Sequence, residues 1–146
     1  MFDLDYCVSF VTNLASKKLS ESLNSKLIKH NVTKSQWIAL YYINREKSIS
    51  QKNLATLMGA KESTVTGILN RVEKEDLIMR TEDKKDKRKN LLSLTEKGQE
   101  LTGKLTDIAQ EFRDACLEGV SLEEQEIFLK VLDKMVSSAQ NWQEEM

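Results

Sequence analysis

Residues 49–98 read ISQKNLATLMGAKESTVTGILNRVEKEDLIMRTEDKKDKRKNLLSLTEKG, and this stretch decides the fold. Two short amphipathic helices are predicted near its start, separated by Gly59, which can end the first helix in a left-handed conformation. The apolar faces of the two helices consist of Leu54, Leu57 and Met58, and of Val65, Ile68, Leu69 and Val72. Two helices joined by a tight turn predict a helix-turn-helix, in which the second helix enters the major groove of DNA.

The outward face of the second helix supplies candidate DNA-contacting side chains, which are Ser63, Thr64, Thr66, Asn70 and Arg71. Hydroxyl, amide and guanidinium groups bind phosphates or base edges, and asparagine can pair with adenine. Each has a structural alternative. The hydroxyls can cap or pack the helix turn, and Arg71 can pair with Glu75 one turn later.

Two apolar runs, Leu77–Met79 and Leu91–Leu94, flank the charged segment DKKDKRK at positions 83–89. This pattern predicts a β-hairpin with a basic tip, a wing that lies against phosphates or reaches the minor groove. The candidate contacts in the wing are Lys84, Lys85, Lys87, Arg88 and Lys89. Arg88 is the candidate for minor-groove insertion, because narrow grooves attract arginine. A solvated run of charges is the alternative for the lysines.

The order of helix, helix, basic wing and the tail Leu94-Thr95-Glu96-Lys97-Gly98 resembles the MarR family of bacterial and archaeal transcriptional regulators. The wing motif of that family, Asp-x-Arg-Asp-x-Arg, is matched by Asp83, Lys85, Asp86 and Arg88, with lysine in place of the first arginine. The resemblance covers essentially the whole chain. It implies that Asp86 pairs with a basic side chain and holds the shape of the wing.

The fold implied is mostly α with a small β-wing, a winged helix-turn-helix with long N- and C-terminal dimerisation helices. Residues 1–146 form a single MarR-like domain, in which 32–98 are the DNA-binding lobe and 1–31 and 99–146 the dimerisation helices. Two positions depart from the family. Gly67 stands where the family often has arginine, and mid-helix glycine costs about 1 kcal/mol. Asp76 stands where the family usually has glycine, and aspartate tolerates the left-handed conformation well enough to preserve the turn.

Long helices are predicted on both sides of the lobe. The first runs from about Leu4 to His30, Thr33 or Ser35 caps the next, and Thr95 starts a fifth. Ser121 and Glu124 form a capping box for the last helix. The predicted inward positions are Leu4, Val8, Val11, Ala15, Leu19, Leu23 and Leu27 in the first helix, Leu101, Leu105, Ile108, Phe112 and Cys116 in the fifth, and Ile127, Phe128, Val131, Leu132, Met135, Val136 and Trp142 in the last.

These terminal stripes carry more apolar surface than one small winged helix can cover. Helix-turn-helix proteins usually read two half-sites as symmetric dimers, so the stripes predict a homodimer interface. An ordinary monomeric core is the alternative.

The charge balance agrees with this arrangement. Residues 1–89 hold 17 Lys or Arg and 11 Asp or Glu, a balance of +6, whereas residues 90–146 hold 5 and 12, a balance of −7. The positive half contains the expected DNA-binding segment. No apolar run of about 18 residues predicts a membrane span, and no secretory signal is recognisable. We therefore expect a cytoplasmic protein with reduced thiols.

Enzymatic functions find little support. His30 is the only histidine, and the two cysteines lack the spacing of a zinc site. No glycine-rich phosphate loop occurs. The sequence predicts no enzyme, no metal and no cofactor.

Two regulatory hypotheses remain open. Cys7 lies early in the first helix, where organic-hydroperoxide repressors similar to this family place a reactive cysteine, although Asp3 and Asp5 would raise its pKa. The tyrosines that contact the thiol in those sensors are replaced here by Lys34 and Trp37 in the matching segment. A small-molecule effector pocket is implied by the resemblance, with Trp37, Tyr41 and Phe112 as candidate lining residues, and core packing is the alternative for each.

The sequence thus predicts a transcriptional regulator, a repressor, that binds double-stranded DNA at a pseudo-palindromic operator as a homodimer under the control of a small-molecule effector. One alternative is a redox-sensing regulator using Cys7. Another is a winged helix used for protein–protein assembly without DNA binding, against which the basic wing argues.

Overall fold

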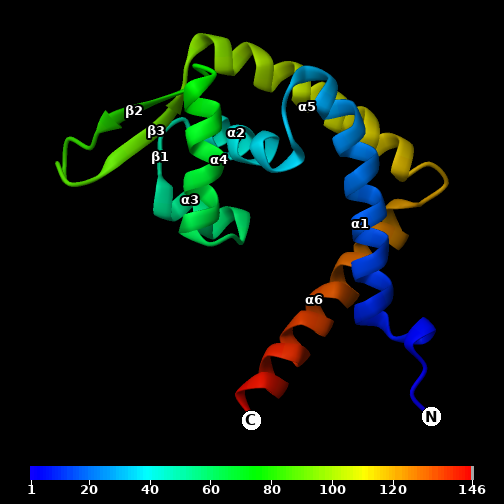
Figure 1. Ribbon diagram of the computed structural model, residues 1–146. Coiled ribbons are helices and arrows are strands. Elements are labelled where there is room, and N and C mark those ends of the chain that lie inside the picture. Colours follow the sequence, from blue (N-terminus) through cyan, green and yellow to red (C-terminus); the bar gives the residue numbers. More distant parts are fainter. Residues whose placement is uncertain (146) are drawn as a thin grey trace. The chain divides into compact units, whose positions relative to one another are not determined.

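The computed structural model describes residues 1–145. It divides into two compact units, Met1–Gln110 and Glu111–Met146, and we describe each by itself. The helical elements are η1 (Leu4–Tyr6), α1 (Val8–Leu27), η2 (Ile28–His30), α2 (Lys34–Glu46), α3 (Gln51–Met58), α4 (Glu62–Lys74), α5 (Glu96–Cys116) and α6 (Leu122–Glu144). The strands are β1 (Ile49–Ser50), β2 (Ile78–Glu82) and β3 (Asn90–Leu94) (Figure 1). The predicted fold class, mostly α with a small β-wing, is confirmed.

The first helix differs from the prediction of one continuous helix over residues 4–30. The chain forms a short 3-10 turn, leaves helical geometry at Cys7 (φ −75°, ψ 109°), and begins α1 at Val8. The side chain of Asp3 caps the 3-10 turn by accepting from the Asp5 N–H at 3.0 Å. A spacing of apolar residues reports a helical face but not a local break in backbone hydrogen bonding, so the pattern could not show this kink.

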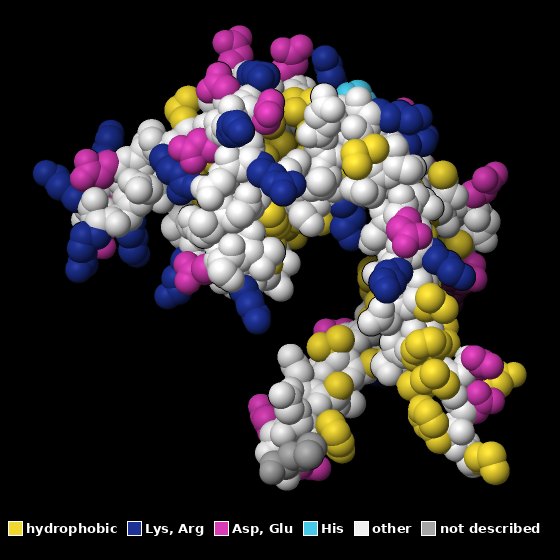
Figure 2. Space-filling model, in the orientation of Figure 1, with side chains coloured by type: hydrophobic (Ala, Val, Ile, Leu, Met, Phe, Trp, Pro, Cys, Tyr) yellow, Lys and Arg dark blue, Asp and Glu magenta, His cyan; other side chains and the backbone are white. Residues whose placement is uncertain are grey.

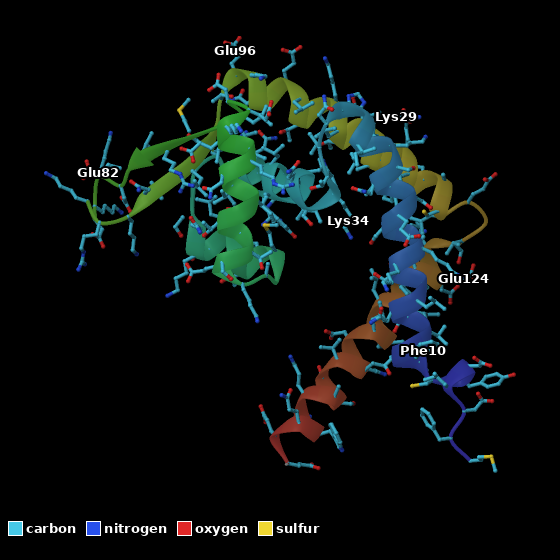
Figure 3. All side chains as sticks on the ribbon, viewed as in Figure 1. Phe10, Lys29, Lys34, Glu82, Glu96 and Glu124 are labelled. Atoms are coloured by element: carbon cyan, nitrogen blue, oxygen red, sulfur yellow. The ribbon has the colours of Figure 1, made fainter. Side chains whose placement is uncertain are left out.

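Thr33, rather than Ser35, caps α2. Its Oγ1 accepts from the Gln36 N–H at 3.2 Å, and Gln36 Oε1 accepts from the Thr33 N–H at 3.1 Å. This reciprocal pair is a capping box, which satisfies two backbone donors at the helix start. Lys34, labelled in Figure 3, ties the same end to α1 by donating from Nζ to Ser20 Oγ at 2.7 Å.

Left-handed residues end the two helices of the helix-turn-helix. Gly59 (φ +62°) ends α3, and Asp76 (φ +59°) follows α4. After α4, Asp76 N–H donates to the Glu73 carbonyl at 2.9 Å and Leu77 N–H to the Val72 carbonyl at 2.9 Å. This is a Schellman motif, which satisfies carbonyls that a helix end leaves free. The turn therefore survives with aspartate at position 76.

The strands form one antiparallel sheet in the order β1-β3-β2. Ile49 pairs with Leu92, and Ile78 pairs with Leu94. Strand β1 was not predicted from the sequence, because two residues are too short to show alternation. The hairpin arm β2 also continues to Glu82 (labelled in Figure 3), beyond the predicted apolar run.

The core of the first unit lies where α2, α3 and α4 pack on the sheet. Its largest fully buried side chains are Leu27, Leu40, Ile43, Leu54, Val65, Leu69, Val72, Leu92, Thr102 and Leu105. The polar Thr102 was not among the residues predicted to face inward, and its Oγ1 has no hydrogen-bond partner within the described chain.

The Leu94–Gly98 tail fixes the start of α5 against the end of α4. Thr95 Oγ1 donates to the Asp76 carbonyl at 2.6 Å and accepts from the Gly98 N–H at 3.0 Å. Lys97 Nζ donates to the Glu75 carbonyl at 2.8 Å. A Cβ at Gly98 would overlap the Leu77 carbonyl, so the fold requires glycine there. The structure therefore explains why Thr95, Lys97 and Gly98 occupy their positions in this chain.

Most of the predicted apolar stripes are not covered within the chain. In α1 only Leu23 and Leu27 are buried, and Figure 2 shows hydrophobic side chains gathered over the N-terminal half of this helix, where Phe10 lies (Figure 3). In α5, Leu105 is buried, whereas Cys116 is exposed and not inward as predicted. The second unit consists of the end of α5 and α6, and none of the residues of α6 is buried.

Candidate nucleic-acid interface

The helix-turn-helix is formed by α3 and α4, with Gln51 bridging them. Gln51 Nε2 donates to Thr66 Oγ1 at 2.6 Å, and Thr66 Oγ1 donates to the Glu62 carbonyl at 2.9 Å. The Thr66 hydroxyl therefore uses its proton and one lone pair inside the motif. This geometry favours the packing alternative for Thr66 over a direct contact with DNA.

The other candidate side chains of α4 lie on its exposed face. Ser63, Thr64, Asn70 and Arg71 are exposed, whereas Val65, Leu69 and Val72 are buried against the lobe. The alternative pairing of Arg71 with Glu75 is not among the ion pairs of residues 1–145. These four side chains are thus presented to a partner outside the chain, and their contact with DNA stays a prediction.

Two aspartates shape the tip of the hairpin. Asp83 Oδ1 accepts from the Lys85 N–H at 2.9 Å, and Asp86 Oδ1 accepts from the Arg88 N–H at 3.1 Å. Such side-chain turns mimic a backbone turn and hold the loop. Asp86 Oδ1 also accepts from Arg88 Nε at 3.1 Å, and these bonds from Arg88 lower the pKa of the Asp86 carboxyl below its usual value.

The basic side chains of the tip point into solvent. Lys84, Lys85, Lys87, Arg88 and Lys89 are all exposed, and the Arg88 side chain is 90% exposed although it pairs with Asp86. Figure 2 shows them as a group of Lys and Arg side chains at the end of the hairpin. A cluster of solvated cations on a projecting arm has the charge and reach to follow a phosphate backbone.

One ion pair joins the wing to α4. Arg80 Nε, on β2, donates to Glu73 Oε2 at 2.9 Å. The sequence pattern did not predict this link between β2 and α4.

A polar groove of about 440 Å³ lies between the wing and the start of α3. Its basic lining residues are Lys52, Arg80, Arg88 and Lys89. Lys52 and Arg80 were not among the residues predicted from the sequence. Pairing of β1 with β3 is what brings residues 50–53 beside the wing, and β1 left no signal in the sequence.

Cys7 occupies the position just before α1. Its Sγ lies 3.3 Å from Ser9 Oγ. The hydrogen bond from Ser9 is the largest cause that lowers the Cys7 pKa, followed by the backbone N–H of Phe10. Asp3 and Asp5, which were expected to raise this pKa, are not among the causes of the shift, and burial is the cause that opposes the lowering.

The candidate effector residues fall in different units. Trp37 and Tyr41 lie on α2, with ring centroids 5.9 Å apart, and Phe112 lies in the second unit. Trp37 Nε1 is buried without a hydrogen-bond partner in the described chain. A pocket formed by these three residues remains a prediction.

Neither a membrane span nor a metal cluster is found in the described part of the chain. No helix there combines the length and apolar character that crossing a bilayer needs. Among residues 1–145, no three His, Cys, Asp or Glu side chains gather in a way that could hold a metal ion.

Comparison with known proteins agrees with this geometry. Residues 32–89 match the model of the MarR family. The HTH-type transcriptional regulator SarZ of Staphylococcus aureus (strain USA300) is 28% identical over 100 residues, which are 68% of each chain. The SarZ protein of Staphylococcus epidermidis (strain RP62A) is 29% identical over 101 residues, or 69% of this chain and 68% of that one.

Solved structures extend the likeness over most of the chain. A probable transcriptional regulator from Pseudomonas aeruginosa has a TM-score of 0.81 and 28% identity, covering 91% of this chain and 99% of that one. S. aureus MepR, in a complex with DNA, has a TM-score of 0.83 and 27% identity, covering 91% and 98%.

The fold and the exposed polar face of α4 define a winged helix-turn-helix protein. Residues 32–89 match the MarR family, and the relatives and solved structures similar to this chain are named as transcriptional regulators.

Proposed function

We propose that this protein binds double-stranded DNA as a homodimer at a pseudo-palindromic operator and acts as a transcriptional repressor. The observation that carries this proposal is the combination of an exposed polar face on α4 with a basic hairpin tip linked to the same helix. The complex of MepR with DNA, at 27% identity, supports the same mode of binding. Its place of action is then the compartment that holds the DNA, the cytoplasm.

Dimerisation is supported by apolar surface that a single chain leaves uncovered. Val8, Phe10, Val11 and Leu14 of α1 are between 41% and 52% exposed. Ile127, Phe128, Leu129 and Val131 of α6 are between 46% and 64% exposed. Contiguous apolar surface of this kind marks an interaction site. A two-fold dimer would cover both faces and set two copies of α4 one DNA turn apart.

We further propose that a small-molecule effector shifts the dimer between conformations that bind DNA and conformations that do not. Trp37, Tyr41 and Phe112 remain the candidate lining residues. The buried and unpartnered indole N–H of Trp37 supports a polar ligand there, because a buried donor usually has a partner.

Selection of bound sequences from a random duplex library tests the function. We expect an enriched motif with two inverted half-sites about one helical turn apart, bound by two chains. Enrichment of a single half-site would contradict the dimeric mode. A protein that enriches no sequence and binds duplex DNA only weakly would favour the protein-assembly alternative.

A redox switch at Cys7 is a second candidate, favoured by the lowered pKa of its thiol. A thiolate is the form that reacts with peroxide, so a lowered pKa increases the reactive fraction. Hydroperoxide should then release wild-type protein from the selected operator but not a Cys7→Ser variant. Equal release of both proteins would leave Cys7 without a sensing role.

A further inference from the structure

Two glycines of the first unit differ in what they do for the fold. A Cβ at Gly98 would overlap a backbone carbonyl, whereas a Cβ at Gly67 would meet no atom within 4 Å. Gly67 lies in the middle of α4, where glycine costs about 1 kcal/mol relative to alanine. The packing of the chain therefore does not require Gly67. What this glycine provides is open space on the surface of the helix.

That space belongs to a hollow of about 220 Å³ between α4 and the start of α2, which we call the Gly67 hollow. It is lined by Thr33, Gln36, Thr64, Gly67, Ile68 and Arg71. Four larger hollows of the first unit each have at least one carboxylate in their lining, whereas the Gly67 hollow has none. The positive charge of Arg71 and the hydroxyl groups of Thr33 and Thr64 suit an anionic occupant.

Gln36 gives independent evidence for such an occupant. Its side chain is only 9% exposed, and the capping box fixes Oε1 on the Thr33 N–H at 3.1 Å. The amide Nε2 must therefore point the other way, and none of the hydrogen bonds within residues 1–145 uses it as a donor. Nε2 is not among the buried polar atoms that lack a partner, so it is open to the surface and free to donate to an acceptor from outside the chain.

Arg71 adds a charge beside this donor. It lies four residues after Gly67 on the same face of α4, is exposed, and is absent from the ion pairs of residues 1–145. The positive end of the α2 dipole also faces this region, because Thr33 and Gln36 form the first turn of that helix.

We propose that the Gly67 hollow holds one phosphate of the DNA backbone in each half-site. Gln36 Nε2 and Arg71 are the donors, and the missing side chain at Gly67 lets the phosphate approach. The phosphate belongs to DNA because the hollow opens beside Thr64, on the helix that enters the major groove, and phosphates border that groove. This inference rests on the proposed DNA binding.

Gln36→Glu separates DNA contact from helix capping. Glutamate at this position still accepts from the Thr33 N–H, and a carboxylate is favourable at a helix N-terminus, so stability should be equal or higher. The donor, however, becomes an anion. We expect operator affinity, measured by fluorescence anisotropy, to fall at least about tenfold. The matched control is Ser35→Glu, which adds the same charge one residue away but does not line the hollow, and it should have a much smaller effect.

Single methylphosphonate substitutions in the selected operator identify the occupant. One neutralised position per half-site should weaken wild-type binding. The same substitution should not weaken binding by Gln36→Glu, because that variant no longer holds the phosphate. Gly67→Met, which fills the hollow, should behave like Gln36→Glu. Gly67→Ala should raise stability, because alanine is the better helix former.

Three results would overturn the inference, and they have different meanings. Equal affinities of Gln36→Glu and Ser35→Glu would remove only the phosphate contact and leave DNA binding intact. The second result has two parts: no methylphosphonate weakens wild-type binding, and inorganic phosphate at constant ionic strength changes the DNA affinity of wild type but not that of Gln36→Glu. Together they would assign the hollow to a free anion. Failure of wild type to bind any duplex would remove the proposed function itself.

Discussion

Glu73 of α4 accepts a hydrogen bond from Arg80 of β2 at 2.9 Å, so the wing is attached to the recognition helix by an ion pair. Both side chains are partly exposed, with 44% and 27% of their surfaces accessible. A pair of this kind contributes little to global stability. Its consequence is geometric, because it fixes the first strand of the wing to the helix that would lie in the major groove.

Glu73→Gln should weaken operator binding up to about fivefold, although it removes a negative charge from a DNA-binding lobe. The reason is that the wing is no longer linked to α4. Glu75→Gln is the control, because Glu75 lies near the same helix end and its side chain is in none of the ion pairs of residues 1–145. Anisotropy on the selected operator would measure both. Tighter binding by both variants would show that only the removed charge matters.

Arg88→Ala should weaken operator binding and reduce its dependence on salt. The log–log salt slope should become shallower by about 0.9 for every phosphate that the variant no longer neutralises. Arg113→Ala is the matched control, since Arg113 also pairs with a nearby aspartate, Asp114 at 2.9 Å, but lies outside α4 and the wing. An unchanged affinity and slope for Arg88→Ala would mean that the wing stays off the DNA.

Gly98→Ala should destabilise the fold by about 1–3 kcal/mol, because a Cβ overlaps the Leu77 carbonyl and α5 must move. Gly103→Ala, in the same helix, has nothing within 4 Å of the new Cβ and should stabilise by up to about 1 kcal/mol. Urea unfolding at one fixed protein concentration compares them, since dimerisation makes stability depend on concentration. Equal effects of the two substitutions would contradict the packing of α5 on Leu77.

Ser9→Ala should raise the Cys7 pKa towards the usual thiol value, because the hydrogen bond from Ser9 is the largest cause of its lowering. The thiolate is the reactive form, so alkylation of Cys7 should require a higher pH in the variant. The pH dependence of iodoacetamide labelling, followed by mass spectrometry of the Cys7 peptide, gives the two pKa values. Identical labelling profiles would exclude Ser9 as the cause.

The sequence was sufficient for features that repeat along a helix or a motif. The buried face of α4, the Gly59 turn and the Ser121–Glu124 capping box all follow from spacing or from local side-chain chemistry. The match of residues 32–89 to the family model likewise confirms the resemblance carried by the helix-turn-helix and the wing motif, whereas the tail at 94–98 lies beyond the matched residues.

The sequence was insufficient where the answer depends on contacts between distant residues. The bridge from Gln51 to Thr66 spans 15 residues and engages the Thr66 hydroxyl inside the motif, although the residue itself is exposed. Pairing of Ile49 with Leu92 places Lys52 near the wing. The local sequence around Ile49 and around Leu92 does not predict that these residues pair. The kink at Cys7 is a backbone feature that an apolar stripe does not encode.

The most direct test of DNA recognition through α4 and the wing is a salt titration of wild-type protein on its selected duplex and on a random duplex of equal length. We predict steep salt dependence on both, since phosphate contacts are shared, and an affinity for the selected duplex higher by about 10³-fold or more. Nearly equal affinities, or binding that does not respond to salt, would contradict sequence-specific recognition by these elements.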